Sequence, residues 1–268
     1  MISWAPILER AAEIVGSYST GVTLRQLYYR LVSEGLFANK QSNYKQLSAR
    51  TAEARRDGWF PALIDNTRTV HRYQTWTGPG EAYDWLRDHY RLDRTEGQEY
   101  RVYIGVEKKG MVEQLMSWFG DLGIPVLALG GYGSQTYFDE IREEIEYRDE
   151  ETVLLYAGDF DPSGEDILRD AIDRIGDFDK VVRVALTPDQ VESYNLPEML
   201  GKATDTRAGR FVATHGRLVQ VELDALDPSD LKELYETELA RFWDRSTYEA
   251  VLERERADLE VMTGGYEA

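Results

Sequence analysis

Four short apolar runs, separated by helical patterns, constrain the fold of this chain most. They are RVYIGV (101–106), IPVLAL (124–129), TVLLYAG (152–158) and VVRVAL (181–186). Short runs that are apolar throughout, instead of alternating with polar residues, are typical of strands buried on both faces. Their alternation with helices predicts an α/β fold with a mostly parallel sheet between helices. VQVEL (219–223) is a candidate further strand.

Before these strands, the chain predicts helices over residues 3–16, 23–35 and 42–57. In the second helix, Thr23 and Gln26 have the spacing of a capping box. Three short helices, the last of them basic, are typical of a helix-turn-helix or winged-helix unit, although a plain three-helix bundle has the same pattern. TWTGPGEAY (75–83) contains a Pro between two Gly, which predicts a linker.

The charge is distributed unevenly along the chain. A formal net charge of −18 argues against a nucleic-acid partner. Residues 21–75, however, hold nine Lys/Arg against four Asp/Glu, so a basic N-terminal region precedes an acidic body. The candidates for contacts with a nucleic-acid backbone are the cations of the third helix, Lys45, Arg50, Arg55 and Arg56. A solvated basic face is the ordinary alternative.

Composition excludes several classes of protein. The chain has no cysteine, which excludes disulfides and thiolate metal sites. No apolar run is long enough to span a membrane, and the N-terminus lacks the basic-then-apolar layout of a signal peptide. We therefore expect a cytoplasmic protein without a membrane partner.

Acidic residues follow two of the predicted strands at the point where each ends. Run 101–106 leads into Glu107, and run 152–158 leads into Asp159, with Asp161 two residues later. Ligands of an open parallel sheet bind outside the carboxyl ends of its strands. Neighbouring strands would bring the three carboxylates together, and Mg²⁺ prefers such oxygen ligands. Alternatively, DFDPSGED is a polar loop that caps a helix over 165–175.

Several motifs together resemble a known family. VEKKGMVEQL (106–115), DFDPSGEDI (159–167), TPDQVESYNLPEML (187–200) and VELDAL (221–226) are similar to stretches of the Toprim domain in the topoisomerase VI A subunit and the related meiotic double-strand-break protein. GGYGS (130–134) departs from the family's GYP at the proline. TLRQLYY (23–29) is similar to the tyrosine motif of the family's winged helix, with Tyr29 in the position of the nucleophile.

The resemblance implies a domain layout. A winged-helix-like domain would span 1–75, and a linker with a helix would span 76–97. A Toprim domain, which is a Rossmann-like and mostly parallel sheet, would span 98–226. Residues 227–268 would form a charged helical C-terminal extension.

The resemblance also implies an activity similar to that of a type IIB topoisomerase A subunit. Tyr29 would attack a DNA phosphodiester and join one strand end, with Mg²⁺, or Mn²⁺ in its place, held by Glu107, Asp159 and Asp161. Glu107 is alternatively a general acid or base at the leaving oxygen. In the family, the tyrosine of one subunit works with the metal site of the other in a homodimer. The chain has no ATP-binding motif, so strand passage would need a separate ATPase subunit.

The helical pattern itself favours Tyr29 as the reactive tyrosine. Tyr28 lies on the apolar stripe of its helix, whereas Tyr29 is rotated by about 100° from that stripe. A tyrosine has a pKa near 10 and needs help to act at neutral pH. Arg25, one turn earlier, is placed to stabilise the phenolate or the scissile phosphate.

Two other functions fit the same residues. In a Toprim nuclease, metal-activated water hydrolyses DNA and Tyr29 has only a structural role. In a non-catalytic DNA- or protein-binding scaffold, Glu107, Asp159 and Asp161 need bind no metal. The sequence does not distinguish DNA from RNA as the substrate.

Overall fold

A four-stranded sheet forms the centre of the molecule. The computed structural model describes residues 3–18, 21–64, 73–131, 133–147, 149–176, 178–200 and 205–264. The strands are β1 (Tyr100–Val106), β2 (Val126–Ala128), β3 (Glu151–Ala157) and β4 (Lys180–Ala185). They are all parallel and lie in the order β2-β1-β3-β4. The prediction of an α/β fold with a parallel sheet is confirmed.

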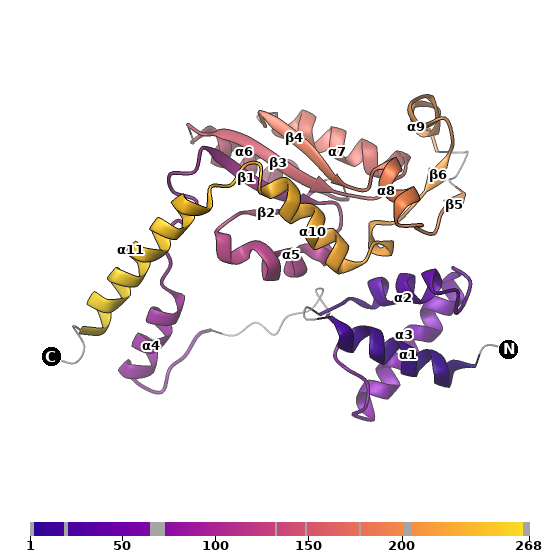
Figure 1. Cartoon of the computed structure of the whole chain (residues 1–268), viewed down its shortest axis with the longest axis horizontal. Coiled ribbons are helices and arrows are strands. Elements are labelled where there is room, and N and C mark those ends of the chain that lie inside the picture. Colours follow the sequence, from indigo (N-terminus) through magenta and orange to yellow (C-terminus); the bar gives the residue numbers. More distant parts are fainter. Residues whose placement is uncertain are drawn as a thin grey trace.

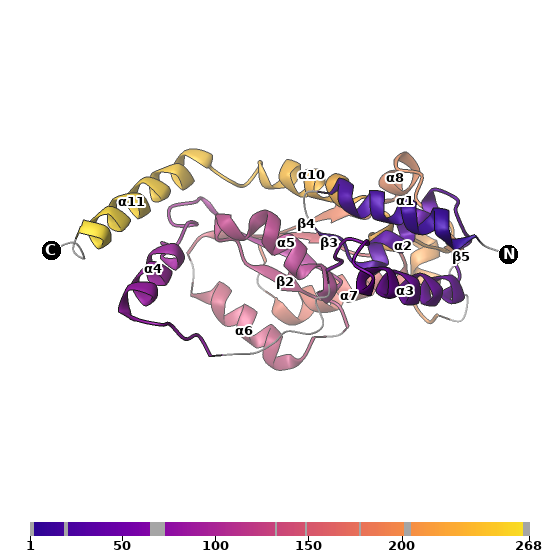
Figure 2. The ribbon, with the colours of Figure 1, turned by 90° about the horizontal axis from the view of Figure 1, so that it is seen from below.

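Helices cover both faces of this sheet (Figures 1 and 2). One face carries α5 (Val112–Phe119) and α10 (Pro228–Leu239), and the other carries α6 (Gln135–Glu146) and α7 (Pro162–Ile175). Alternate residues of β3 therefore enter different cores. Val153 and Leu155 join the core on one side, whereas Leu154 and Tyr156 pack with Phe138 of α6 on the other. This double burial explains why β3 has an unbroken apolar run from Val153 to Ala157.

The N-terminal unit consists of α1 (Trp4–Ser17), α2 (Leu24–Ser33) and α3 (Gln41–Arg56). The predicted capping box is present, because Thr23 accepts from the Gln26 N–H while the Gln26 side chain accepts from the Thr23 N–H. In the described part of this unit, strand pairing is limited to one isolated bridge between Thr23 and Ile64. Residues 65–72, which follow the three predicted helices, lie outside the described residues, so the winged-helix layout stays a prediction.

The N-terminal unit docks below the carboxyl edge of the sheet (Figure 1). Gln26 of α2 donates a buried hydrogen bond to Gln114 of α5 at 2.7 Å. The Tyr18 hydroxyl donates to Asp227, just before α10, at 2.5 Å. These contacts hold α2, and therefore Tyr29, beside the ends of the strands.

The predicted C-terminal extension over 227–268 consists of two different parts. Helix α10 belongs to the sheet core, because Leu231, Tyr235 and Leu239 are buried. The Tyr235 hydroxyl donates to the Gly105 carbonyl at 2.8 Å. The boundary predicted at residue 227 therefore cuts through this core, and only the chain beyond α10 extends away from it.

Helix α11 (Arg245–Gly264) forms an arm with the segment that follows α4 (Pro79–His89) (Figure 1). Arg94 pairs with Glu255 of α11 at 2.6 Å, and Tyr90 donates to Asp258 at 2.7 Å. The predicted linker-and-helix segment thus packs with the C-terminal helix. No described helix, α11 included, combines the length and the apolar character needed to cross a membrane.

A small ribbon completes the carboxyl edge. β5 (Met199–Leu200) pairs antiparallel with β6 (Val219–Gln220), so the predicted strand in 219–223 forms outside the main sheet. The following bridge between Phe160 and Val221 brings the next turn, η3 (Leu223–Ala225), against the end of β3. The remaining elements are η1 (Lys109–Met111), η2 (Gly120–Leu122), α8 (Pro188–Ser193) and α9 (Ala208–His215).

Gly130→Ala is expected to destabilise the fold. A Cβ atom at Gly130 would lie 1.9 Å from the backbone carbonyl oxygen of Glu107, so the chain after β2 would have to move away from β1. We expect a loss of about 3 kcal/mol in the free energy of unfolding, measured by urea denaturation. Gly16→Ala in α1 is the control, because its Cβ would meet no atom within 4 Å and should leave stability unchanged or slightly raised. Equal denaturation midpoints for Gly130→Ala and wild type would contradict this account.

Candidate active site

The three acids predicted at the strand ends lie together at the carboxyl edge of the sheet. Glu107 Oε2 accepts a hydrogen bond from the Asp159 N–H at 2.8 Å. Asp161 Oδ1 accepts from the Gly164 N–H at 2.7 Å, which caps α7. The helix-capping alternative is therefore realised for Asp161, while its carboxylate stays at the same edge as the other two. Asp159 and Asp161 are each only 7% exposed.

Gly164 permits the close packing of this edge. A Cβ atom there would lie 2.4 Å from the Asp159 carbonyl oxygen and 3.1 Å from Glu107 Oε2. The first turn of α7 can reach the ends of β1 and β3 only because this residue has no side chain.

Three further charged residues belong to the cluster and were not predicted as site residues. Lys108 Nζ lies 2.9 Å from Asp159 Oδ1, 2.6 Å from Glu222 Oε2 and 2.7 Å from Asp224 Oδ2. The Leu223 N–H also donates to Asp159 Oδ1, at 2.7 Å. Two sequence signals point to these residues. Lys108 directly follows Glu107, and Glu222 and Asp224 repeat the spacing of Asp159 and Asp161 after a short apolar run.

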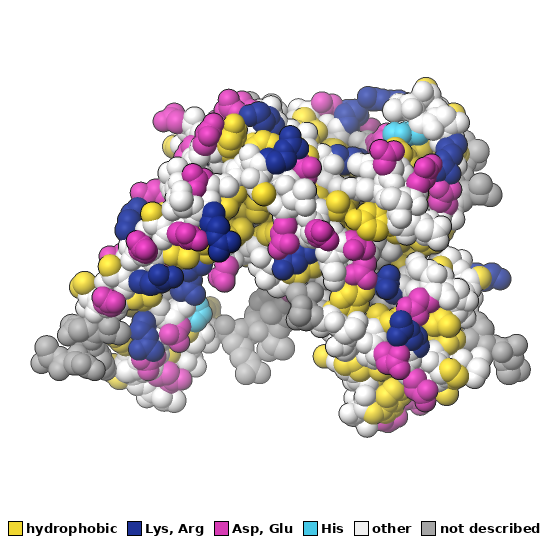
Figure 3. All heavy atoms as spheres, viewed as in Figure 1, with side chains coloured by type: hydrophobic (Ala, Val, Ile, Leu, Met, Phe, Trp, Pro, Cys, Tyr) yellow, Lys and Arg dark blue, Asp and Glu magenta, His cyan; other side chains and the backbone are white. Residues whose placement is uncertain are grey.

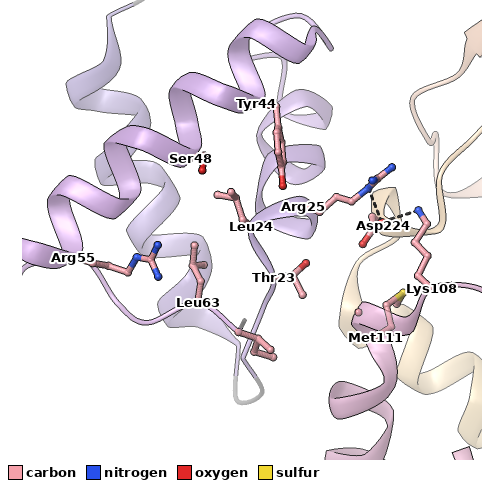
Figure 4. Close-up of a pocket in the computed structure, with 12 residues that line it drawn as sticks. Thr23, Leu24, Arg25, Tyr44, Ser48, Arg55, Leu63, Lys108, Met111 and Asp224 are labelled. Atoms are coloured by element: carbon pink, nitrogen blue, oxygen red, sulfur yellow. Dashed lines mark hydrogen bonds and ion pairs between the residues drawn. The ribbon is translucent and has the colours of Figure 1, made fainter. Parts of the chain in front are cut away.

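Arg25 connects α2 to this cluster. Its guanidinium pairs with Glu222 Oε2 at 2.5 Å and with Asp224 Oδ2 at 3.0 Å. Figure 4 shows Arg25 and Lys108 converging on Asp224 from opposite sides. The Arg25 guanidinium carbon also lies 5.9 Å from the centre of the Tyr29 ring. Within a single chain, helix α2, which carries Tyr29, therefore lies next to the carboxylate cluster.

Tyr29 is more buried than its helical position suggests. It is 7% exposed, and its ring packs edge-on against Tyr28 at 5.4 Å. The sequence places Tyr29 off the apolar stripe of α2, but both tyrosines are buried because the sheet edge covers a second side of that helix. The Tyr28 hydroxyl bonds to Asn39 and Lys40. For the Tyr29 hydroxyl no hydrogen-bond partner is found among the described residues, and the residue lines a cavity of about 270 Å³.

Burial and neighbouring charges change the acidity of the site. Burial raises the pKa of Asp159 to about 7, and Glu107 and Glu222 add to that effect while Lys108 opposes it. Burial likewise raises the pKa of Glu107. Burial alone would raise the pKa of Glu222, but Lys108 and Arg25 outweigh it and lower that pKa. Negative charge is therefore well compensated at Glu222 and poorly compensated at Glu107 and Asp159.

The same forces act on the tyrosine. Burial raises the pKa of the Tyr29 hydroxyl, and Glu222 raises it further. Arg25 and Lys108 act in the opposite direction. Without a further positive charge nearby, Tyr29 is a neutral phenol at physiological pH.

The donor chemistry of the cluster fits a hard divalent cation. Of the five carboxylates, Asp159, Glu222 and Asp224 pair with the cationic side chains Lys108 and Arg25, whereas Glu107 and Asp161 have no cationic partner among the described residues. The Tyr156 hydroxyl is buried against Gly158 and has no hydrogen-bond partner among the described residues. A water on a bound cation would satisfy it. Among the same residues, however, no three His, Cys, Asp or Glu side chains are arranged to hold a metal ion.

The four cations predicted to contact nucleic acid do not share one face of α3. All four are exposed. Arg50 lies over the Trp4 ring at 5.2 Å, whereas Arg55, about 140° around the helix, lines a cavity of about 530 Å³ with Arg25 and Lys108 (Figure 4). No hydrogen bond, ion pair or ring contact of the Lys45 or Arg56 side chain is found in the described part of the chain. On the face in Figure 3, cationic and acidic side chains are intermixed over the N-terminal unit.

Comparisons with known proteins give no family for this chain. A scan against models of protein families matches none of them. A search of curated proteins finds no significant match. A function therefore has to be inferred from the residues and the geometry of the site.

Mg²⁺ binding is expected to strengthen as the pH rises toward and above 7. The raised pKa of Asp159 means that the folded, metal-free protein holds a proton that the unfolded chain has released. Its stability should therefore fall as the pH rises from about 4 to about 7, and Mg²⁺ must displace that proton in this range. We expect a larger Mg²⁺-induced increase in Tm at about pH 8 than at about pH 5.5. An increase in Tm that is equal at both pH values would contradict the assignment of Asp159.

Proposed function

We propose that this protein cleaves DNA strands in a Mg²⁺-dependent transesterification, with Mn²⁺ as an alternative ion. Tyr29 is the nucleophile, and the three strand-end carboxylates Glu107, Asp159 and Asp161 hold the ion. The observation that carries the proposal is the pair of contacts from Arg25 to the carboxylate cluster, at 2.5 and 3.0 Å. These contacts hold the tyrosine helix against the edge where the strand-end acids meet.

The residues divide the chemistry between them. A bound Mg²⁺ supplies positive charge for the phosphoryl oxygens. The Tyr29 hydroxyl gives its proton to solvent water, its oxygen forms the new bond to phosphorus, and the bond to the leaving sugar oxygen breaks, so that this oxygen must take up a proton. Alternatively, with the ion held by Asp159 and Asp161 alone, Glu107, whose pKa is raised by burial, gives that oxygen its proton. Arg25 is close enough to the Tyr29 ring to stabilise the phenolate.

The proposal includes partners. A homodimer would cut both strands of a duplex, and strand passage would need a separate ATPase subunit. Arg55 and Arg25, which line one cavity, are the best placed cations for the DNA backbone. The acidic body should make binding sensitive to salt. A cytoplasmic location fits this activity.

Hydrolysis by metal-activated water is the second candidate. The burial of Tyr29 favours it, because a 7% exposed phenol with a raised pKa is poorly prepared to attack a phosphate. In that case the strand-end acids keep their role, and Tyr29 only packs against Tyr28. A scaffold without activity is the third, since Lys108 and Arg25 already pair with part of the cluster.

Cleavage of supercoiled plasmid separates these functions. The full chain is incubated with plasmid and Mg²⁺ at low salt, stopped with detergent, and analysed with and without protease. Breaks whose ends carry protein, released only by protease, are expected from the proposal. Breaks with free ends would identify a hydrolase. An absence of breaks with either Mg²⁺ or Mn²⁺ would count against both enzymes.

A further inference from the structure

Lys108 holds the central position of the carboxylate cluster. Its ammonium group lies within 2.9 Å of an oxygen from each of Asp159, Glu222 and Asp224. These three residues come from two segments more than 60 residues apart, which meet through the bridge between Phe160 and Val221. The Lys108 side chain is only 18% exposed. A buried cation with three carboxylate partners has the surroundings of a bound metal ion.

The cluster divides into two halves around Asp159. On one side, Glu222 and Asp224 each pair with both Lys108 and Arg25. On the other side, Glu107 and Asp161 accept hydrogen bonds only from backbone N–H groups, and no cationic side chain pairs with them among the described residues. Asp159 belongs to both halves, since its Oδ1 faces Lys108 while Oδ2 has no partner in the described part of the chain.

This division matches the layout of a two-metal site with one metal replaced. In such sites two cations lie about 4 Å apart and stabilise both reacting oxygens. Here the amino group of Lys108 is fixed by the chain on one side of the shared carboxylate. The other side keeps the free oxygens and the unpaired Tyr156 hydroxyl.

We propose that Lys108 takes the place of a second cation, so that the centre binds a single divalent ion on the Glu107 and Asp161 side of Asp159. This inference rests on the proposed metal centre and adds its stoichiometry. It also assigns Lys108 a role, namely compensation of the Glu222 and Asp224 charges that a second ion would otherwise neutralise. Because the ammonium is attached to the chain, divalent ions in solution do not displace it.

The test counts Mn²⁺ ions bound to the whole chain of 268 residues. Titration calorimetry gives the stoichiometry, and electron paramagnetic resonance distinguishes an isolated Mn²⁺ from a pair coupled through a shared carboxylate. We expect one isolated ion per wild-type chain and a coupled pair in Lys108→Met. Lys109→Met is the matched control and should keep one ion. The neighbouring Lys109 is exposed, and its side chain forms no hydrogen bond or ion pair with the cluster in the described part of the chain.

Each result bears on the inference. Two ions in the wild type, or one ion in a folded Lys108→Met, would overturn it and leave the proposed cleavage function intact. No bound ion in the wild type would overturn both the inference and the metal centre on which it rests. If Lys108→Met does not fold, Lys108→Arg replaces it. Because Arg keeps the positive charge, one bound ion is expected in Lys108→Arg. A coupled pair of ions would show that the charge at this position does not determine the number of bound ions, and would overturn the inference.

Discussion

Asp159→Asn is expected to abolish Mg²⁺-dependent cleavage and, at about pH 8, to stabilise the metal-free protein. Burial raises the pKa of Asp159 to about 7, so the ionised carboxylate costs stability in the folded state at higher pH. Asparagine removes that charge and keeps an oxygen to accept from the Leu223 N–H. Lys108 retains Glu222 and Asp224 as partners.

The loss of cleavage should be about a hundredfold or more, because a charge-stabilising group at the reacting phosphate is removed. Plasmid cleavage rates and thermal denaturation in EDTA measure the two effects. Asp179→Asn is the matched control at the opposite edge of the sheet. Its carboxylate accepts from the backbone and hydroxyl of Thr152, which lowers its pKa. This variant should lose stability and keep cleavage. A destabilised Asp159→Asn that still cleaves would contradict the assigned role of Asp159.

Tyr29→Phe is expected to remove all protein-linked strand breaks without changing stability. No hydrogen bond to the Tyr29 hydroxyl is found among the described residues, so its removal leaves no polar partner unsatisfied. The neighbouring Tyr28→Phe should behave in the opposite way. It should cost about 1–2 kcal/mol, because the Tyr28 hydroxyl bonds to Asn39 and Lys40, and it should keep cleavage.

The same plasmid assay, run with both variants at equal protein concentration, measures the loss of protein-linked breaks. Urea denaturation measures the change in stability. If Tyr29→Phe still produced protein-linked ends, another nucleophile would be required. If it produced free ends at the wild-type rate, the reaction would be a hydrolysis and Tyr29 would have only a packing role.

The sheet and its acidic edge follow from local sequence patterns. Strands β1 and β3 are mostly apolar because helices cover both faces, and this pattern is visible without a structure. Glu107 and Asp159 follow two such strands directly. Since β1 and β3 are parallel neighbours, the two acids had to meet at one edge.

The remainder of the site depends on contacts between distant segments. Glu222 and Asp224 reach the cluster through a bridge between Phe160 and Val221, which no local pattern determines. The burial of Tyr29 results from docking of α2 against the sheet edge, whereas a helical stripe reveals only one packed face. Helix α10 is rich in charge, yet Tyr235 anchors it to β1, so the domain layout that the resemblance implies separates α10 from the sheet on which it packs.

The measurement that tests the central claim most directly is identification of the tyrosine joined to DNA. Cleavage is trapped with detergent, DNA and protein are digested, and the peptides are analysed by mass spectrometry for a tyrosine carrying a nucleotide. The chain has 17 tyrosines, so the position of the adduct is informative. The proposal predicts the adduct on Tyr29 and only in the presence of Mg²⁺ or Mn²⁺. An adduct on another tyrosine, or cleaved DNA without any adduct, would contradict it.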